Sequence, residues 1–454
     1  MRILLTVHQF LPEFHAGTEI LTFDTAQALL ARGHDVSVFT GFPARGGPDD
    51  AHRFDRYTHD GIAVERFHHD HAPMGGETNI AELEYNNRFF AAYFRDYLIR
   101  VKPDVVHFFH LQRLSASAID VCHELGIPMA LTPTDFWLVC PTNQLLLPNH
   151  ALCSGPEPNG VNCLRHVVAL TQPAPARVFL NMVPDALVAT MIRALDGGML
   201  PRQKHASYAR ALSARHRFMK SRMNRVDRVA VPTRLMADML ARNGLSPAKA
   251  KFLPFGIKAD GWSRNPPASA GGRLRVGFIG TLYEHKGVHV LLEAVRSLSA
   301  DLPIEVRIYG NTGNFPEYVA RLHELAANDP RIAFCGTFPY NRISGVFSSL
   351  DVLVVPSIWY ENTPLVIYAA QACGCPVIAS NLGGMSEAVT HEKNGLLFEP
   401  GNASDLAQAI RRLACDRALL RGLGEQARKP KSIAEYAAEL ENVYTEILAE
   451  RHTV

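Results

Sequence analysis

Short apolar segments with the composition of β-strands alternate with helical segments along this chain, and the alternation starts twice. The first series opens with the predicted strand Ile3–Val7, followed by a predicted helix over Thr18–Arg32 and a predicted strand over Val36–Thr40. The second opens with the predicted strand Val276–Ile279 and the predicted helix Val288–Ser297. Strands that alternate with helices form parallel sheets covered by helices on both faces. The pattern therefore predicts an α/β protein with two doubly wound, Rossmann-like domains.

The chain is long enough for two such domains, since 454 residues exceed what one hydrophobic core usually serves. Residues 254–272 are rich in Pro, Gly, Ala and Ser and form the predicted linker. We therefore expect an N-terminal domain over residues 1–253 and a C-terminal domain over residues 273–430. Residues 431–454 contain a predicted amphipathic helix that no strand follows.

Composition and charge exclude several classes of protein. The chain is 47% hydrophobic and 20% charged, which is ordinary for a globular protein and excludes a disordered or fibrous one. A net charge of +2 gives no general signal for a polyanion, and we expect no nucleic-acid partner. Eight scattered cysteines favour a reducing compartment. The first apolar run is too short for a signal peptide, and no apolar stretch is long enough to span a bilayer. We expect a cytoplasmic protein, and peripheral contact with the inner face of the membrane stays open as an alternative.

The loop after the first strand of the second series, Gly280–Gly287, is a candidate phosphate site. A glycine turn lets the backbone approach a phosphate, the following helix offers free N–H groups, and Lys286 adds a full charge. The order Lys-Gly differs from the Gly-Lys-Ser/Thr of a Walker A loop. A solvated surface lysine at a helix start would give the same pattern.

A second candidate loop leaves the predicted strand Val352–Val355 and contains Glu361. A carboxylate accepts hydrogen bonds from sugar hydroxyls, and backbone N–H groups at the start of the next helix can face an anion. The alternative is that Glu361 only caps that helix. The loop residues that we expect beside a ligand are Asn362, Thr363, Pro364 and Leu365.

Polar residues also follow the predicted strands of the first series. Gly17 and Thr18 stand at the start of a predicted helix, where the backbone can approach an anionic group, although an ordinary loop glycine would look the same. His107 and His110 end the strand that begins at Val105, and a histidine in that position is often a packed residue. No Gly-x-Gly-x-x-Gly occurs, so dinucleotide binding loses its main support.

Together these segments resemble the retaining glycosyltransferases of family four, which have the GT-B fold and use nucleotide sugars. The resemblance covers nearly the whole chain, and it implies two domains facing each other across a cleft, with a C-terminal helix crossing back to the first, acceptor-side domain. The stretches that carry it are Pro356–Glu361, Gly374–Ser380, Gly383–Glu387, Gly17–Glu19, Asp104–His107, Gly280–Gly287 and Asn394–Phe398.

The resemblance implies a role for each matching position. Glu361 would hold hydroxyls of the donor sugar, and Lys286 would neutralise the leaving diphosphate. His107 and His110 complete the catalytic candidates. The positions that would contact the donor are Gly17, Thr18, Thr281, Asn362, Thr363, Pro364, Leu365 and Ala369.

Three departures from the family pattern bear on these roles. The family's second glutamate, which binds the ribose, corresponds to Ala369, which should weaken nucleotide binding; the alanine is either natural or engineered. The family's arginine beside the glycine turn is Thr281 here. Phe109 replaces the second histidine of a His-x-His pattern, so that His110 is offset by one position.

We therefore expect a retaining hexosyltransferase that moves a sugar from a nucleotide-diphosphate sugar to a glycan or lipid-linked acceptor, in bacterial-type polysaccharide, glycolipid or other surface-glycan synthesis. The chain has no Asp-x-Asp, and we expect neither a metal nor a cofactor. The alternatives are a catalytically silent nucleotide-sugar binder, favoured by Ala369 and Thr281, and an epimerase or phosphorylase of the same fold. Lys286→Ala is expected to abolish transfer with thermal stability nearly unchanged.

Two weaker patterns complete the analysis. Residues 202–228 carry many Lys and Arg against one acid, Asp227, and would either contact an anionic membrane or lipid-linked acceptor or form an exposed helix face. His68–His71 resembles a metal-binding cluster, but we expect this segment to be a solvated polar loop.

Overall fold

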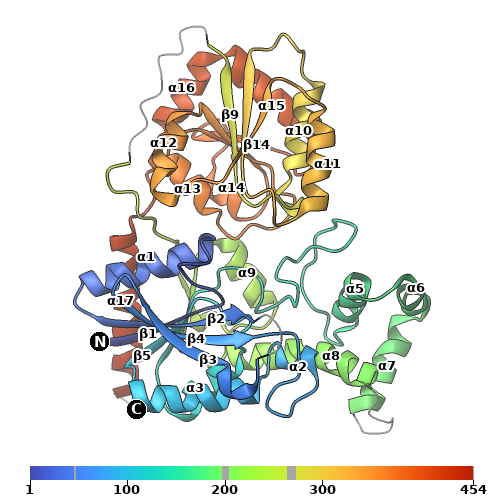
Figure 1. Ribbon diagram of the computed structural model, residues 1–454, viewed down its shortest axis with the longest axis vertical. Helices are drawn as coiled ribbons and strands as arrows, with labels where there is room; N and C mark the ends of the chain where they lie inside the picture. Colours follow the sequence, from blue (N-terminus) through green and yellow to red (C-terminus); the bar gives the residue numbers. More distant parts are fainter. Residues whose placement is uncertain (45–47, 197–203, 263–271, 453–454) are drawn as a thin grey trace. The chain divides into compact units, whose positions relative to one another are not determined.

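The computed structural model describes residues 1–44, 48–196, 204–262 and 272–452, which form two compact units (Figure 1). The first unit contains Met1–Gly256 and the segment from Ile433 onward, and the second contains Ile257–Ser432. Residues 257–262, expected in the linker, belong to the second unit, where Ile257 forms a bridge with Ser432. The rest of the expected linker falls largely on residues 263–271, which lie outside the described residues.

The first unit is built on an eight-stranded sheet with the order β3-β4-β2-β1-β5-β6-β7-β8. All neighbours pair in parallel except β3 and β4, which form an antiparallel edge. The central strands are buried on both faces, which explains their continuous apolar sequences. The strands are β1 (Arg2–Val7), β2 (Asp35–Pro43), β3 (Phe54–His59), β4 (Ile62–His69), β5 (Val105–Phe108), β6 (Met129–Leu131), β7 (Arg228–Val231) and β8 (Ala250–Phe252).

Helices follow most of these strands. They are α1 (Gly17–Ala31), α2 (Ile80–Leu83), α3 (Arg88–Val101), α4 (Ser117–Glu124), α5 (Val161–Thr171), α6 (Ala174–Met182), α7 (Asp185–Asp196), α8 (Lys204–Met223), α9 (Arg234–Arg242) and α17 (Ile433–His452). Helices α5 to α8 are inserted between β6 and β7, and they enclose a small core of their own around Val161, Leu164 and Ile192.

The C-terminal helix α17 returns to the first unit, as predicted. It packs against α1 and β6, and Tyr436 and Tyr444 on it are fully buried. Glu441 pairs with Arg32 just after α1. The last helix therefore completes the core of the first unit.

The second unit has a six-stranded sheet with the order β11-β10-β9-β12-β13-β14, and all its pairs are parallel. This is a doubly wound arrangement, in which the order of the strands reverses between β9 and β12. One apolar cluster lies on each face of the sheet. The elements are β9 (Leu274–Ile279), α10 (Val288–Ser297), β10 (Ile304–Tyr309), α11 (Pro316–Ala326), β11 (Ile332–Gly336), α12 (Ile343–Ser348), β12 (Val352–Val355), α13 (Leu365–Ala372), β13 (Val377–Ser380), α14 (Gly384–Ala388), β14 (Gly395–Phe398), α15 (Ala403–Cys415) and α16 (Arg417–Glu425).

The histidine-rich segment after Phe67 is only in part the solvated loop that we expected. His68 and His69 end strand β4, and His69 is buried, whereas Asp70 and His71 follow the strand in a loop in which His71 is exposed. Within the described residues, no three His, Cys, Asp or Glu side chains are grouped as metal ligands. Among the residues that the structure describes, no helix is long and apolar enough to cross a bilayer.

Candidate active site

The two candidate loops of the second unit meet at its topological switch point. The loop after β9 and the loop after β12 leave neighbouring strands at their carboxyl ends. Ligands of open α/β sheets bind at this place. The Ile358 N–H donates to the His285 carbonyl at 2.9 Å, and a Cβ on Gly287 (φ +72°) would lie 1.9 Å from the Pro356 carbonyl oxygen. Only glycine at position 287 allows the two loops to approach this closely.

Lys286 and Glu361 form an ion pair between these loops. Lys286 Nζ lies 2.6 Å from Glu361 Oε1, which also accepts hydrogen bonds from Ser357 Oγ and Trp359 Nε1, both at 2.8 Å. Glu361 is only 7% exposed, and this burial raises its pKa. Lys286 and the two hydrogen bonds outweigh burial and leave the pKa of Glu361 below its ordinary value. Glu361 is therefore a buried, ionised carboxylate with three donors on one oxygen.

Two aromatic rings line the pair. The Trp359 ring lies 4.4 Å from the His285 ring, between centroids, and Lys286 Nζ lies 5.1 Å from the Trp359 centroid. Burial, followed by the charge of Lys286, lowers the pKa of His285 to about 3, so this imidazole is neutral. Lys286 is thus the cation of this loop, and it is held by both a carboxylate and a π-face.

The backbone after Glu361 is held by the start of α14. The Gly384 N–H donates to the Glu361 carbonyl at 2.9 Å, and a Cβ on Gly384 would lie 1.5 Å from the Asn362 carbonyl oxygen. Pro364 is the residue that precedes the first turn of α13, so the loop leads directly into a helix N-terminus. Asn362 is buried, whereas Thr281 is exposed on the neighbouring loop.

Ala369 lies on α13 within the apolar cluster on one face of the sheet, and it is 4% exposed. An alanine fills this position without a polar group. A longer acidic side chain would have to reach out of the cluster to contact a ligand.

The structure argues against the prediction of His107 as a catalytic residue. The ring is fully buried; Nδ1 lies 2.5 Å from Tyr444 Oη on α17, and Nε2 lies 2.8 Å from Thr132 Oγ1. Burial lowers the pKa of His107 to about 3. Both ring nitrogens are used inside the first unit, so His107 fastens α17 to β5.

His110 lies at the carboxyl end of β5 with a defined tautomer. Its Nδ1 accepts from the Gln112 N–H at 3.0 Å, so Nε2 carries the proton that it donates to Asp135 at 2.8 Å. Gly17 and Thr18 form the first turn of α1, beside the same end of the sheet. These predicted residues therefore gather at the switch point of the first unit, between β1 and β5.

Around His110 lies a cluster of buried polar groups that the sequence patterns did not select. His8 follows β1, its ring lies 4.3 Å from that of His110, and its Nε2 lies 3.5 Å from Glu19 Oε1. Burial lowers the pKa of His8 and raises that of Glu19. Four buried atoms in this part of the first unit have no hydrogen-bond partner among the described residues: His8 Nδ1, Glu19 Oε2, His69 Nε2 and Arg113 Nη1. Unpaired buried polar atoms are costly, so their convergence marks a site built for a polar ligand.

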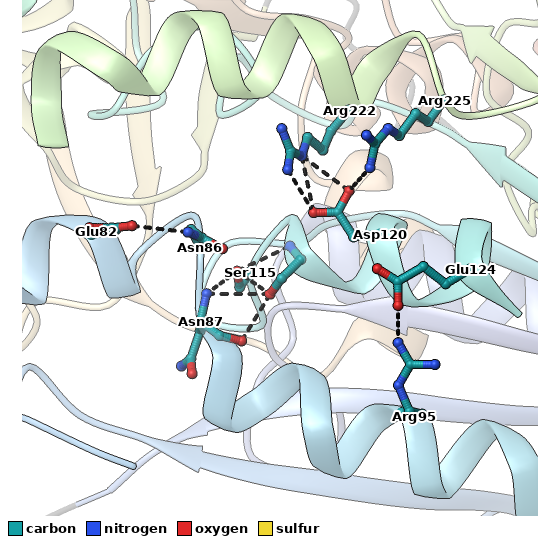
Figure 2. A network of polar contacts seen from close by, with 10 residues as sticks. Glu82, Asn86, Asn87, Arg95, Ser115, Asp120, Glu124, Arg222 and Arg225 are labelled. Atoms are coloured by element: carbon teal, nitrogen blue, oxygen red, sulfur yellow. Dashed lines mark hydrogen bonds and ion pairs between the residues drawn. The ribbon is translucent and has the colours of Figure 1, made fainter. Parts of the chain in front are cut away.

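Four arginines of the basic run over residues 202–228 form ion pairs within the first unit. Figure 2 shows Arg222 and Arg225 both directed at Asp120 of α4. Arg215 is buried against Glu84, and Arg228 pairs with Glu450 on α17. Arg202 lies outside the described residues. Arg215 and Arg222 therefore attach α8 to the sheet domain, so these two residues are not part of a free basic face.

Comparison with known proteins agrees with this architecture. The sucrose-phosphate synthase of Thermosynechococcus elongatus superposes with a TM-score of 0.67 at 20% identity, covering 99% of both chains. HepE of Anabaena in complex with UDP and glucose superposes with a TM-score of 0.62 at 16% identity, covering 98% of this chain and 99% of that one.

Curated relatives align over part of the chain. The D-inositol 3-phosphate glycosyltransferase of Corynebacterium jeikeium is 36% identical over 170 residues, which is 36% of this chain and 40% of that protein. The enzyme of the same name from Streptomyces bingchenggensis is 32% identical over 220 residues, or 44% of this chain and 48% of that protein. The aligned region thus spans less than half the length of these relatives.

Two family descriptions match the two units. Residues 263–430 match "Glycosyl transferases group 1", and residues 16–256 match "Glycosyl transferase 4-like domain". The second match covers more than half of the chain, which therefore has the GT-B fold and belongs to the glycosyl transferase 4-like family.

Proposed function

We propose that this protein is a retaining glycosyltransferase that moves a hexose from a nucleoside-diphosphate sugar to a glycan or lipid-linked acceptor. The observation that carries the proposal is the Lys286–Glu361 pair at the switch point between β9 and β12. A cation and a buried carboxylate lie there side by side, where a sugar diphosphate presents a negative group next to hydroxyl donors. Relatives of this fold have been solved with UDP-glucose and with ADP.

Departure of the diphosphate is the step that these residues would assist. Positive charge develops at the anomeric carbon as negative charge develops on the diphosphate, so fixed positive potential at the phosphate lowers the barrier. Lys286 and the N–H groups at the start of α13 would supply it. Glu361 would accept hydrogen bonds from sugar hydroxyls and thereby fix the ring. In a retaining reaction without a protein nucleophile, a phosphate oxygen of the donor accepts the proton of the attacking hydroxyl on the same face.

The acceptor would bind at the polar cluster of the first unit. Arg113 Nη1 can donate a hydrogen bond, and His8 Nδ1 and Glu19 Oε2 can accept hydrogen bonds from hydroxyl groups. All three atoms are buried. An acceptor with several hydroxyl groups would satisfy them at once. Arg113→Ala is therefore expected to raise the KM for acceptor while leaving donor binding unchanged.

The compartment and pathway belong to the same proposal. None of the eight cysteines, all of which lie in the described part of the chain, forms a disulfide, which suits the reducing conditions of a cytoplasmic enzyme. A role in bacterial-type polysaccharide, glycolipid or other surface-glycan synthesis follows from a polyhydroxylated or lipid-linked acceptor.

Thermal stabilisation by UDP-, GDP- and ADP-sugars tests donor binding, because a ligand that binds only the folded state stabilises it by RT ln(1 + L/Kd), where L is the free ligand concentration, and so raises Tm. We expect one base to stabilise the protein and to support transfer to an acceptor. Lys286→Met should remove most of the stabilisation, and Lys393→Met, an exposed lysine outside both loops, should not. If none of these nucleotides raises the Tm of the native chain or of Ala369→Glu, the proposal is wrong.

A catalytically silent nucleotide-sugar binder is the second candidate, and Ala369 is the observation that favours it. Ala369→Glu restores the carboxylate of the family pattern. A large gain in transfer, together with tighter nucleotide binding, would support the enzyme. Tight nucleotide binding without transfer in both forms would support the silent binder.

A further inference from the structure

Exposed apolar side chains are concentrated on α6, α7 and the end of α5 in the first unit. Eleven large apolar or aromatic side chains are exposed in the described residues, and six of them lie between positions 170 and 191. Phe179 is 70% exposed and Met182 is 78% exposed. We call the set the α6–α7 surface: Leu170, Val178, Phe179, Met182, Leu187 and Met191.

The spacing of these residues places them on shared helix faces. On α6, Met182 is four positions after Val178 and three after Phe179, so it lies on the same side of the helix as both. On α7, Leu187 and Met191 point outward, whereas Val188 and Ile192 are buried in the small core of the insertion. Figure 1 shows α5, α6 and α7 together at one side of the sheet of the first unit.

Arg165 on α5 holds this arrangement in place. Its guanidinium donates to the carbonyls of Leu180 and Val183 at the turn between α6 and α7, and it pairs with Asp185 at the start of α7. Arg165 therefore ties the turn between α6 and α7 to α5, and the exposed apolar side chains other than Leu170 lie on the two helices that this turn connects.

The charge on the helices of this surface is positive. Residues 161–193 contain three arginines, Arg165, Arg177 and Arg193, against one acid, Asp185, which pairs with Arg165. Arg177 on α6 donates to the Ala169 carbonyl, and Arg193 on α7 donates to the Thr190 hydroxyl; among the side chains that the structure describes, neither guanidinium forms an ion pair.

We propose that the α6–α7 surface docks on an anionic lipid bilayer. The two short helices would lie in the plane of the interface, with Phe179 and Met182 entering the acyl boundary. Arg177 and Arg193 would meet the negative headgroups. A second copy of this chain is disfavoured as the occupant, because two surfaces of the same positive charge repel each other.

The apolar and the charged side chains of this surface should contribute to vesicle binding in ways that respond differently to salt. Phe179→Gln with Met182→Gln removes the two most exposed apolar groups and should weaken binding to anionic vesicles by at least about tenfold. Arg177→Glu with Arg193→Glu should weaken it by more than about tenfold at low salt. The effect of the charge reversal should shrink as salt rises, whereas the effect of the apolar change should persist.

Sedimentation of the full chain with vesicles tests the proposal in the absence of any sugar donor, so its outcome is independent of transferase activity. The vesicles contain phosphatidylcholine alone or phosphatidylcholine and phosphatidylglycerol in equal parts. Phe252→Gln replaces an aromatic side chain that is exposed elsewhere in the first unit and serves as the matched control. Thermal unfolding checks that each variant is folded.

We expect binding to the anionic vesicles, its loss in the Phe179/Met182 and Arg177/Arg193 variants, and no loss in the control. Failure to bind anionic vesicles at low salt would overturn the proposal. So would binding that the two double variants leave unchanged. Concentration-dependent self-association that Phe179→Gln abolishes, without any lipid binding, would instead identify a protein interface and overturn it as well. Met182→Gln alone covers the case in which the double variant does not fold.

Discussion

Removing the Lys286–Glu361 pair should cost far more stability than a surface ion pair would. Nζ and Oε1 are 2.6 Å apart, Glu361 is nearly buried, and the Lys286 side chain is 24% exposed. At this distance the Coulomb energy is about 1.6 kcal/mol with the dielectric constant of water and about 6 kcal/mol with that of a protein surface, before desolvation. Hydrogen bonds to charged groups contribute about 1.5–3 kcal/mol net. We therefore expect a coupling free energy of about 2–3 kcal/mol.

The perturbation is a double-mutant cycle of Lys286→Met and Glu361→Gln. Lys286→Met alone should cost about 3 kcal/mol, because it leaves the buried Glu361 carboxylate without its counter-charge. This replaces the sequence-based expectation of nearly unchanged stability. Glu361→Gln alone should cost less, since an amide oxygen can still accept from Ser357 and Trp359. The double variant should be no less stable than Lys286→Met.

Urea denaturation of the unliganded chain near neutral pH measures the cycle, with Lys393→Met as the control. Acid conditions provide a second readout. In the native chain the lowered pKa of Glu361 contributes stability that is present above the ordinary value of 4.5 and lost as pH falls. In Lys286→Met, burial dominates and raises this pKa, so the variant should lose less stability, or gain some, on acidification. Additive free energies, with a coupling below about 0.5 kcal/mol, would refute this reasoning.

Three further predictions concern packing. Tyr444→Phe should destabilise the first unit by about 1–3 kcal/mol, because it leaves His107 Nδ1 buried without a partner; thermal unfolding measures this, and nucleotide binding should not change. The free energy of unfolding should fall as pH drops from 6.5 towards 3, by up to about 1.4 kcal/mol per pH unit for His107. The reason is that His107 binds a proton in the unfolded chain and not in the folded core. A flat profile of Tm against pH would contradict this prediction. Gly384→Ala should weaken donor binding by more than about tenfold, because its Cβ displaces the Asn362 carbonyl, whereas Gly345→Ala, with no atom within 4 Å, should cost nothing; equal nucleotide Kd values for the two variants would contradict the argument.

The helices and strands that flank the site were predictable from local patterns. Helix α10 begins and ends at the predicted residues, Val288–Ser297, because apolar spacing and flanking glycines are properties of short segments. The parallel sheets followed from the alternation of elements. The hairpin of β3 and β4 did not, because its polar and histidine-rich strands look like a loop when the edge of the sheet is unknown.

Partners distant in sequence were not predictable. His107 stands at a strand end where a catalytic group would also stand, and only its contact with Tyr444, 337 residues later, reveals a packing role. The arginines of α8 look like a free basic surface until Asp120, 102 residues before Arg222, is placed beside them. The cluster of His8, Glu19 and Arg113 was missed for the same reason, since three separate segments supply it.

By itself the sequence determined the class of fold, the order of the elements and the loops that carry chemistry, because periodicity and glycine turns act within a few residues of each other. Only the tertiary structure decided which charges meet. Lys286 and Glu361 are 75 residues apart, and they become a pair because β9 and β12 lie side by side in the sheet and Gly287 lets their loops touch. Burial, which sets the pKa of Glu361 and of His107, also exists only after the chain has closed around them.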